Sequence, residues 1–392
     1  MLAARFISVL LAAGLSALPS LRATAQVSFE LIDGGLSRLP IRLTEITDAT
    51  VEWNDPTGDE GVLPLSDALG LVTRGAWTLG DSAGERNLLS FEPSMLRLTD
   101  GRRLTGSLSA QADLPEVLRW QHPVLGGVDV PLEQIDRLVL PRATVGAGSV
   151  EFLPPADRSD VVLLRNGDRL KGFVVDLGRD AVIEVDGREV VVPMEAVHQV
   201  ALANPRERWS GPMVWLLDGS VLGADEIRFE DGRFILIEDA ATLTEADATG
   251  PGQSITLRPD HVSAVSFDTR RLVPLASLVA EEGAGGRDGV FGAAPIEVSG
   301  GSRIEVGLPA SARRLTLTSE LPLRSRAWGR CELVLSADGV ALARIPLSAA
   351  DPVDEVNLDI AGAQTLEIVL EPGEFGRVQT AIEIRAALVA VD

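Results

Sequence analysis

Hydrophobic residues along this chain form short runs that are separated by turns containing glycine, asparagine or aspartate. One such stretch passes from Val161-Val162-Leu163-Leu164 through Asn166-Gly167 to Phe173-Val174-Val175, and Val190-Val191-Val192 follows after Asp186-Gly187. Runs rich in β-branched residues and bounded by such turns are typical of short strands joined by hairpins. The pattern therefore predicts an all-β chain with many short strands and little helix.

The stretch 160–203 is the clearest copy of a repeat, and 94–141 and 212–268 follow the same plan. The segment 26–75 is a degenerate fourth copy. Turn glycines and later prolines alternate in strict order along the copies: Gly34, Pro64, Gly101, Pro131, Gly167, Pro193, Gly219 and Pro259. A proline followed by an apolar residue a few positions on suits a single helical turn that leads into a last strand.

Strands this short bury their apolar face and hide their edges most readily in a closed sheet. The repeat resembles the small SH3-like or Sm-like barrels, which implies tandem small β-barrels. The alternative is one large β-sandwich in which the Asp-Gly turns recur by accident.

The segment 272–392 alternates polar and apolar residues at period two, as in an antiparallel sandwich. Its clearest passages are the hairpin Ala337-Asp338-Gly339-Val340 and the stretch from Val356 through Ala361-Gly362-Ala363-Gln364 to Val369. These passages resemble the NPCBM family, the novel putative carbohydrate-binding modules of large exported bacterial proteins. The resemblance implies a galactose-binding-like jelly-roll sandwich.

The chain departs from the family's pattern before the last strand. Where the family has an aspartate-led, tryptophan-containing stretch, this chain has Arg377-Val378-Gln379-Thr380-Ala381-Ile382-Glu383. The departure weakens the expectation of sugar and of calcium binding. We expect no cofactor, and calcium is the one candidate ion.

Trp328 lies among Arg324, Arg326 and Arg330 in an expected loop of the C-terminal segment. An aromatic face that stacks on a sugar ring, beside polar groups that bond its hydroxyls, makes these residues the candidate ligand-binding site. The alternative is a tryptophan packed under arginine stems. Trp120 and Trp215 occupy repeat positions where core packing is expected.

The N-terminus has the order of an export signal. A basic start at Arg5 precedes the apolar run 6–18 and the small-x-small sequence Ala23-Thr24-Ala25, which predicts a signal peptide over 1–25. A buried N-terminal helix is the alternative. We expect an exported protein of the periplasm, cell envelope or extracellular space, with no membrane span after cleavage.

Composition narrows the function further. The net charge of −22 disfavours nucleic acid as a partner, because binding to phosphates relies on Lys and Arg. The single cysteine, Cys331, allows no intramolecular disulfide. The histidines, His122, His198 and His261, have no metal-site spacing, so we expect no metal site and surface or half-buried side chains.

No Gly-x-Ser-x-Gly elbow or phosphate-binding loop is present, so we expect no enzyme, a hydrolase with a cryptic site being the remote alternative. The sequence predicts an exported, non-catalytic binding protein whose C-terminal module binds a glycan. The competing hypothesis is a periplasmic or cell-wall scaffold that contacts envelope proteins without affinity for sugar.

Overall fold

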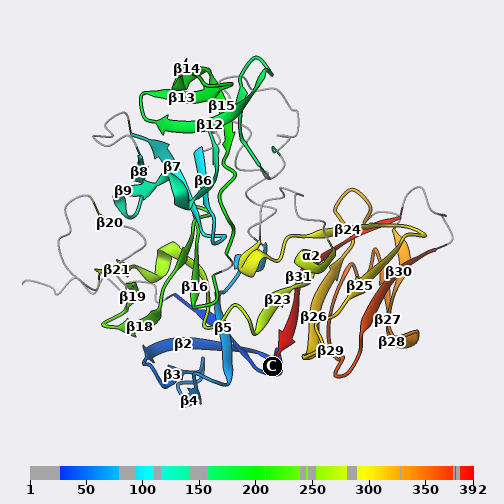
Figure 1. Cartoon of the computed structure of the whole chain (residues 1–392). Helices are drawn as coiled ribbons and strands as arrows, with labels where there is room; N and C mark the ends of the chain where they lie inside the picture. The colour runs from blue at the N-terminus through cyan, green and yellow to red at the C-terminus, as the bar shows by residue number, and fades with distance from the viewer. Residues whose placement is uncertain are drawn as a thin grey trace, which may run out of the picture.

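A computed structural model describes residues 27–78, 94–109, 116–141, 153, 158–207, 209–238, 244–245, 253–279, 289–326, 329–373, 376 and 380–392. The predicted signal peptide lies outside the described residues. The structure is nearly all β, as expected, and has two parts (Figure 1): strands β1 to β22 form one continuous hydrogen-bonded sheet, and β23 to β31 form a sandwich.

The strands before Leu272 fall into four groups with the same order, here called units 1 to 4. Unit 1 comprises β1 (Phe29–Asp33), β2 (Arg38–Ile46), β3 (Thr50–Asn54), β4 (Glu60–Pro64) and β5 (Ala68–Thr73). Unit 2 comprises β6 (Ser94–Leu98), β7 (Arg103–Leu108), β8 (Val117–His122), β9 (Gly126–Pro131) and β10 (Ile135–Val139). Unit 3 comprises β11 (Asp160–Leu164), β12 (Arg169–Leu177), β13 (Asp180–Val185), β14 (Arg188–Pro193) and β15 (Val197–Ala201).

Unit 4 repeats the order with a divided second strand and an insertion. It comprises β16 (Met213–Leu216), β17 (Val221–Gly223), β18 (Glu226–Glu230), β19 (Arg233–Glu238), β20 (Thr244–Glu245), β21 (Gln253–Leu257) and β22 (Val262–Ser266). In every unit the first strand pairs antiparallel with both the second and the last strand. A 3-10 turn follows the fourth strand in units 2 to 4, at Leu132–Gln134, Met194–Ala196 and Pro259–His261, where the sequence predicts a helical turn.

The first hairpin of a unit needs one residue with positive φ. Gly101, Gly167 and Gly219 supply it in units 2 to 4, with φ of 93°, 95° and 91°. In unit 1 the corresponding residue is Leu36, at φ 58°, and the matching of Gly34 to the other turn glycines was wrong by two positions. Leu36 is buried beside the C-terminal part, so its packing offsets the strain of a left-handed leucine.

Equivalent strands join the units edge to edge. Last strands β10 and β15 pair around Leu138 and Val200, and last strands β5 and β22 pair around Leu71 and Val265. Both pairings are antiparallel and both centre on the fourth residue of the strand, so each has local two-fold symmetry. Units 2 and 4 meet where β7 pairs with β17 at Arg103 and Val221. The units therefore follow the spatial order 3, 2, 4, 1, from the top to the bottom of Figure 1.

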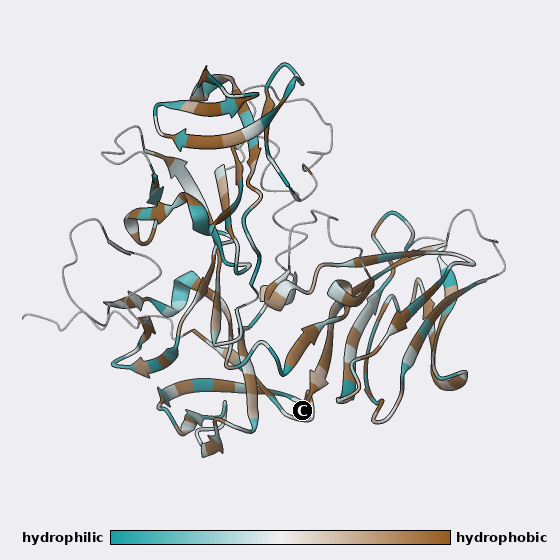
Figure 2. Ribbon diagram, in the orientation of Figure 1, coloured by the Kyte–Doolittle hydropathy of each residue, from teal (hydrophilic) through white to brown (hydrophobic). Residues whose placement is uncertain are grey.

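The sandwich consists of two antiparallel sheets. One has the order β23 (Leu272–Pro274), β31 (Ala381–Val391), β26 (Ala312–Glu320) and β29 (Val353–Asp359), with β24 (Ile296–Ser299) also on β31. The other has the order β25 (Arg303–Gly307), β30 (Thr365–Pro372), β27 (Arg330–Ala337) and β28 (Val340–Ser348). Leucine, isoleucine and valine from both sheets fill the core between them. Figure 2 shows hydrophobic residues as brown bands along the strands of both sheets.

The two passages that resemble NPCBM modules contact each other. Asp338 and Gly339 have φ of 48° and 80° and form the hairpin between β27 and β28. The Asp338 carboxylate accepts hydrogen bonds from the backbone N–H groups of Gln364 and Thr365, at 3.1 and 2.9 Å. These bonds lower the pKa of Asp338, that of Thr365 most. Both passages thus have a structural role in one corner of the sandwich.

An apolar junction joins the array of units to the sandwich. Phe291, in the segment before β24, packs against Trp215 and Trp77 with ring centroids 5.2 and 5.9 Å apart. Leu36 of unit 1 and Leu388 of β31 belong to the same buried cluster. A short helix, α2 (Leu275–Val279), follows β23, and no helix in the described ranges is long and apolar enough to cross a membrane.

Candidate functional site

Two of the predicted arginines are held by carboxylates of the sandwich. Arg324 donates to Glu297 of β24 at 2.5 Å, whereas Arg326 donates to Glu320 of β26 and to the Leu321 carbonyl. Arg330 begins β27 and is exposed. Trp328 lies outside the described residues, so its place among these arginines stays a prediction.

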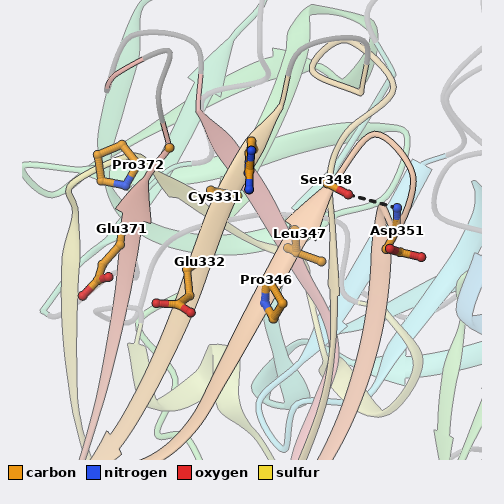
Figure 3. A pocket seen from close by; sticks show the side chains of 10 residues that line it. Cys331, Glu332, Pro346, Leu347, Ser348, Asp351, Glu371 and Pro372 are labelled. Carbon is orange, nitrogen blue, oxygen red and sulfur yellow. Dashed lines mark hydrogen bonds between the residues drawn. The ribbon is translucent and has the colours of Figure 1, made fainter.

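Arg330 instead lines an open groove of about 590 Å³ at one end of the sandwich. The groove crosses β30, β27 and β28 and reaches the turn before β29. Figure 3 shows its side chains, which are those of Arg330, Cys331, Glu332, Pro346, Leu347, Ser348, Asp351, Glu371, Pro372 and Gly373.

Strand register explains which of these side chains face outward. Glu332 pairs with Glu371 on one side and with Pro346 on the other, so the three form one rung across the sheet. Their neighbours Cys331 and Leu347 point into the core and are buried. Because side chains alternate between the two faces of a strand, the rung Glu371, Glu332 and Pro346 lies on the outer face.

Two carboxylates therefore occupy adjacent positions at the groove. Like charges directly opposite each other destabilise a sheet, and Arg344 compensates by contacting Glu332 at 2.6 Å and Glu371 at 3.5 Å. The hydrogen bond to Glu332 raises the pKa of Arg344. The site thus presents two carboxyl groups, both in contact with Arg344, beside the donor Arg330.

The rest of the groove supplies weaker polar groups and apolar surface. Ser348 accepts from the Asp351 backbone N–H at 3.2 Å, which fixes the turn into β29. Gly373 donates to the Arg330 carbonyl at 2.9 Å, and a side chain there would collide with that carbonyl. Pro346 and Pro372 add C–H faces. Such a surface can hold a ligand with hydroxyl groups around a partly apolar ring.

Sequence reasoning missed Glu332 and Glu371. Each alternates with core leucines at period two, which signals an outward side chain. The sequence does not show that β27 and β30, thirty residues apart, lie side by side. Cys331 beneath the groove is a core residue, and burial raises the pKa of its thiol to about 11.

A second polar cluster lies at the contact between units 2 and 4. His122 Nε2 is 2.8 Å from Ser220 Oγ and 3.5 Å from Asp218 Oδ2, and His122 Nδ1 accepts from the Val124 and Leu125 backbone N–H groups. A hydrolytic triad requires the carboxylate on the nitrogen opposite the serine. Here both contacts involve one nitrogen, and His122 and Ser220 are buried, so the cluster holds units together.

The expectation of surface or half-buried histidines was wrong for two of them. His122 and His198 are buried at 1% and 2% exposure, while His261 is intermediate. Trp120 and Trp215 are buried, as predicted. Within the described part of the chain, no group of three or more His, Cys, Asp or Glu side chains is placed to hold a metal ion.

No protein family model matches the chain, and no curated protein matches it significantly. Among solved structures it is similar to the CBM51 module of Clostridium perfringens GH95 in complex with methyl-galactose, at 15% identity over 25% of this chain and 70% of that one, with a TM-score of 0.23. The CBM51-2 and INT domains of Clostridium perfringens ZmpB match at 14% identity, 44% of each chain and a TM-score of 0.26.

The tandem CBM51 modules of a family 98 glycoside hydrolase from Streptococcus pneumoniae match at 10% identity, over 59% of this chain and 88% of that one, with a TM-score of 0.25. The chain spans less than half of the ZmpB fragment. With every TM-score far below 0.5, the geometry of the chain itself remains the basis for its function.

Proposed function

We propose that this protein is an exported, non-catalytic binding protein that holds a carbohydrate in the groove at the end of its sandwich. The observation that carries the proposal is the rung of Glu371, Glu332 and Pro346, which places two carboxyl groups beside an apolar ring on an open surface. Sugar hydroxyls donate to such carboxylates, and Arg330 donates to sugar oxygens. The sequence resemblance to NPCBM modules supports the same ligand class.

Openness of the groove and the chemistry of its walls favour binding over catalysis. Glu332 and Glu371 are neighbours on one face of the sheet and both contact Arg344, whereas glycoside hydrolysis needs two carboxyl groups that flank the scissile bond. A binding module has no such requirement. Contacts to single hydroxyl groups are weak, so the groove suits a polysaccharide that several copies of the protein bind at once.

The test is a glycan array and polysaccharide pull-down with the chain from Gln26 to Asp392. We expect binding that Glu332→Gln and Glu371→Gln reduce by about tenfold each, the cost of one charge-assisted hydrogen bond. Glu305→Gln, on the outer face of β25, is the matched control and should bind normally. Trp328→Ala distinguishes the groove from the arginine-rich loop, because only a loop site requires the tryptophan.

A folded chain that binds no glycan would overturn the proposal and favour the protein scaffold. One observation already favours that second candidate: Arg324 and Arg326 are engaged by Glu297 and Glu320, so the predicted arginine platform is taken up by ion pairs. A pull-down from envelope extract, compared between the chain and its Glu332→Gln variant, separates the two. Partners retained by both forms would support the scaffold.

A further inference from the structure

The first hairpin turn is a contact site in units 1, 2 and 4, and within the described part of the chain nothing contacts that of unit 3. Strand register makes Arg38, Arg103, Arg169 and Val221 equivalent, because each is the first residue of its second strand and pairs with the same position of the first strand. What covers this position can therefore be compared across the units.

Units 2 and 4 cover each other at this position. Arg103 pairs with Val221 across the contact, which joins equivalent residues and so has local two-fold symmetry. The Arg103 side chain donates to the Gly219 carbonyl at 2.8 Å, and Thr105 Oγ1 lies 2.8 Å from Ser220 Oγ. The contact thus joins an arginine to the opposite turn and a β7 side chain to the residue after that turn.

Unit 1 is covered by the sandwich. The Gly35 carbonyl accepts from Asn357 at 2.9 Å, and Arg38 forms an ion pair with Glu355 at 3.2 Å. Both partners lie on β29, so this surface of the sandwich is already occupied within the chain.

Unit 3 keeps the same chemistry, and no other described segment of the chain covers it. Residues 165–169 are all exposed, and among the described residues no side-chain hydrogen bond or ion pair involves Arg169 or Lys171. Phe173, on the same face of β12, is 66% exposed. Unit 3 lies at the end of the array opposite unit 1, at the top of Figure 1.

We propose that unit 3 is a self-association surface, on which a second copy of this chain docks through its own unit 3. The contact repeats the one between units 2 and 4, with Arg169 facing its counterpart across a two-fold axis. The sandwich of a second copy cannot serve instead, because unit 1 covers the equivalent surface there.

Charged side chains of unit 3 find partners in this arrangement, which offset the meeting of the two Arg169 side chains at the axis. Transfer of the observed contact places Arg169 against the opposite Gly167 carbonyl, as Arg103 is placed against Gly219. It also places Lys171, the equivalent of Thr105, against Asp168, the equivalent of Ser220. The hydrogen bond between the Thr105 and Ser220 hydroxyls is thus replaced by an ion pair between Lys171 and Asp168. The two-fold axis generates this ion pair twice.

The first experiment is sedimentation velocity of the chain from Gln26 across a wide range of concentration, without glycan. We expect a dimer, and Lys171→Glu should raise its dissociation constant by about tenfold or more, since it sets two like charges against each other. The double variant Lys171→Glu/Asp168→Lys restores opposite charges and should restore the dimer. Arg188→Glu, at the exposed first residue of β14, should have no effect.

A second experiment needs no charge reversal. A residue on a two-fold axis meets itself, so Arg169→Cys should form a covalent dimer on mild oxidation, and Arg188→Cys should not. Cys331 does not interfere because it is buried. A chain that stays monomeric at every concentration, or equal cross-linking at both positions, would overturn the proposal. The outcome is independent of whether the groove binds a carbohydrate.

Discussion

Two of the internal junctions of the molecule differ in the kind of contact that closes them, apolar packing in one and hydrogen bonds in the other. Phe291, Leu36 and Trp215 close the junction between the array and the sandwich by apolar packing. His122, Ser220 and Thr105 close the contact between units 2 and 4 by hydrogen bonds among buried polar groups. Apolar packing is non-directional and indifferent to pH, whereas a buried histidine network depends on each atom's direction and on one protonation state.

This difference teaches where each junction is vulnerable. Loss of buried side-chain volume should destabilise the apolar junction, whereas protonation of His122 should destabilise the polar contact. Nδ1 of His122 accepts two backbone N–H groups, so it cannot take up a proton without losing both bonds. Burial lowers the pKa of His122, and the charge of Asp218 opposes that shift only in part.

The largest expected effect is at the apolar junction. Phe291→Ala removes the ring that packs against Trp215 and Trp77, and we expect a loss of about 3 to 5 kcal/mol of unfolding free energy. Urea denaturation followed by tryptophan fluorescence measures it. Leu323→Ala, at a residue 75% exposed, is the control and should stay near the wild type. A small effect of Phe291→Ala would show that other contacts hold the sandwich against the array of units.

The next effect is at Leu36, where we expect the glycine variant to be more stable than the alanine variant, the reverse of the usual order. Leu36→Ala removes a buried side chain but keeps positive φ, so we expect a loss of about 2 to 4 kcal/mol. Leu36→Gly loses the same packing yet relieves the strain, so it should be milder by about 1 kcal/mol. Chemical denaturation measures the unfolding free energy of both variants. An alanine variant more stable than the glycine variant would show that the backbone of Leu36 is not strained.

A pH titration of stability tests the polar contact. Because the pKa of folded His122 is below 6.5, the unfolded chain binds a proton first as pH falls, so stability is full above 6.5 and declines below it. One proton contributes a slope of at most about 1.4 kcal/mol per pH unit. His122→Gln should flatten that slope between pH 6.5 and 5, and unchanged curves would assign the acid sensitivity to other groups.

The smallest effect concerns the corner of the sandwich. Asp338→Ala removes the acceptor of the Gln364 and Thr365 N–H groups from an exposed turn, and we expect the melting temperature to fall by about 2 °C. Since those bonds lower the Asp338 pKa, their contribution is present above pH 3.8 and is lost as pH falls through the folded pKa. In thermal melts, the difference in melting temperature between wild type and variant should therefore be full at pH 7 and should shrink as pH falls below 3.8.

Local signals made much of the fold predictable. The turns at Asn166-Gly167 and Asp338-Gly339 and the 3-10 turn after Pro193 all follow from backbone preferences of a few adjacent residues. The joining of last strands was not predictable, because β5 and β22 are nearly two hundred residues apart and nothing in either strand encodes its partner. Leu36 escaped prediction because its left-handed backbone depends on a distant apolar surface.

The candidate site was less predictable than the fold. Arg324 and Arg326 are close in sequence and lie in one turn, but they bind carboxylates on different strands, Glu297 of β24 and Glu320 of β26. Of the predicted residues that the structure describes, only Arg330 lines the groove. The acidic pair opposite it arises from register between β27 and β30, a property of the assembled sheet.

The pairing of last strands has a consequence for how such a chain can evolve. An unpaired last strand would leave a free edge of hydrogen-bonding groups, which invites aggregation. In this chain each last strand covers another, β10 with β15 and β5 with β22. A single duplicated unit would disturb that balance, so lineages of this protein should gain or lose units two at a time.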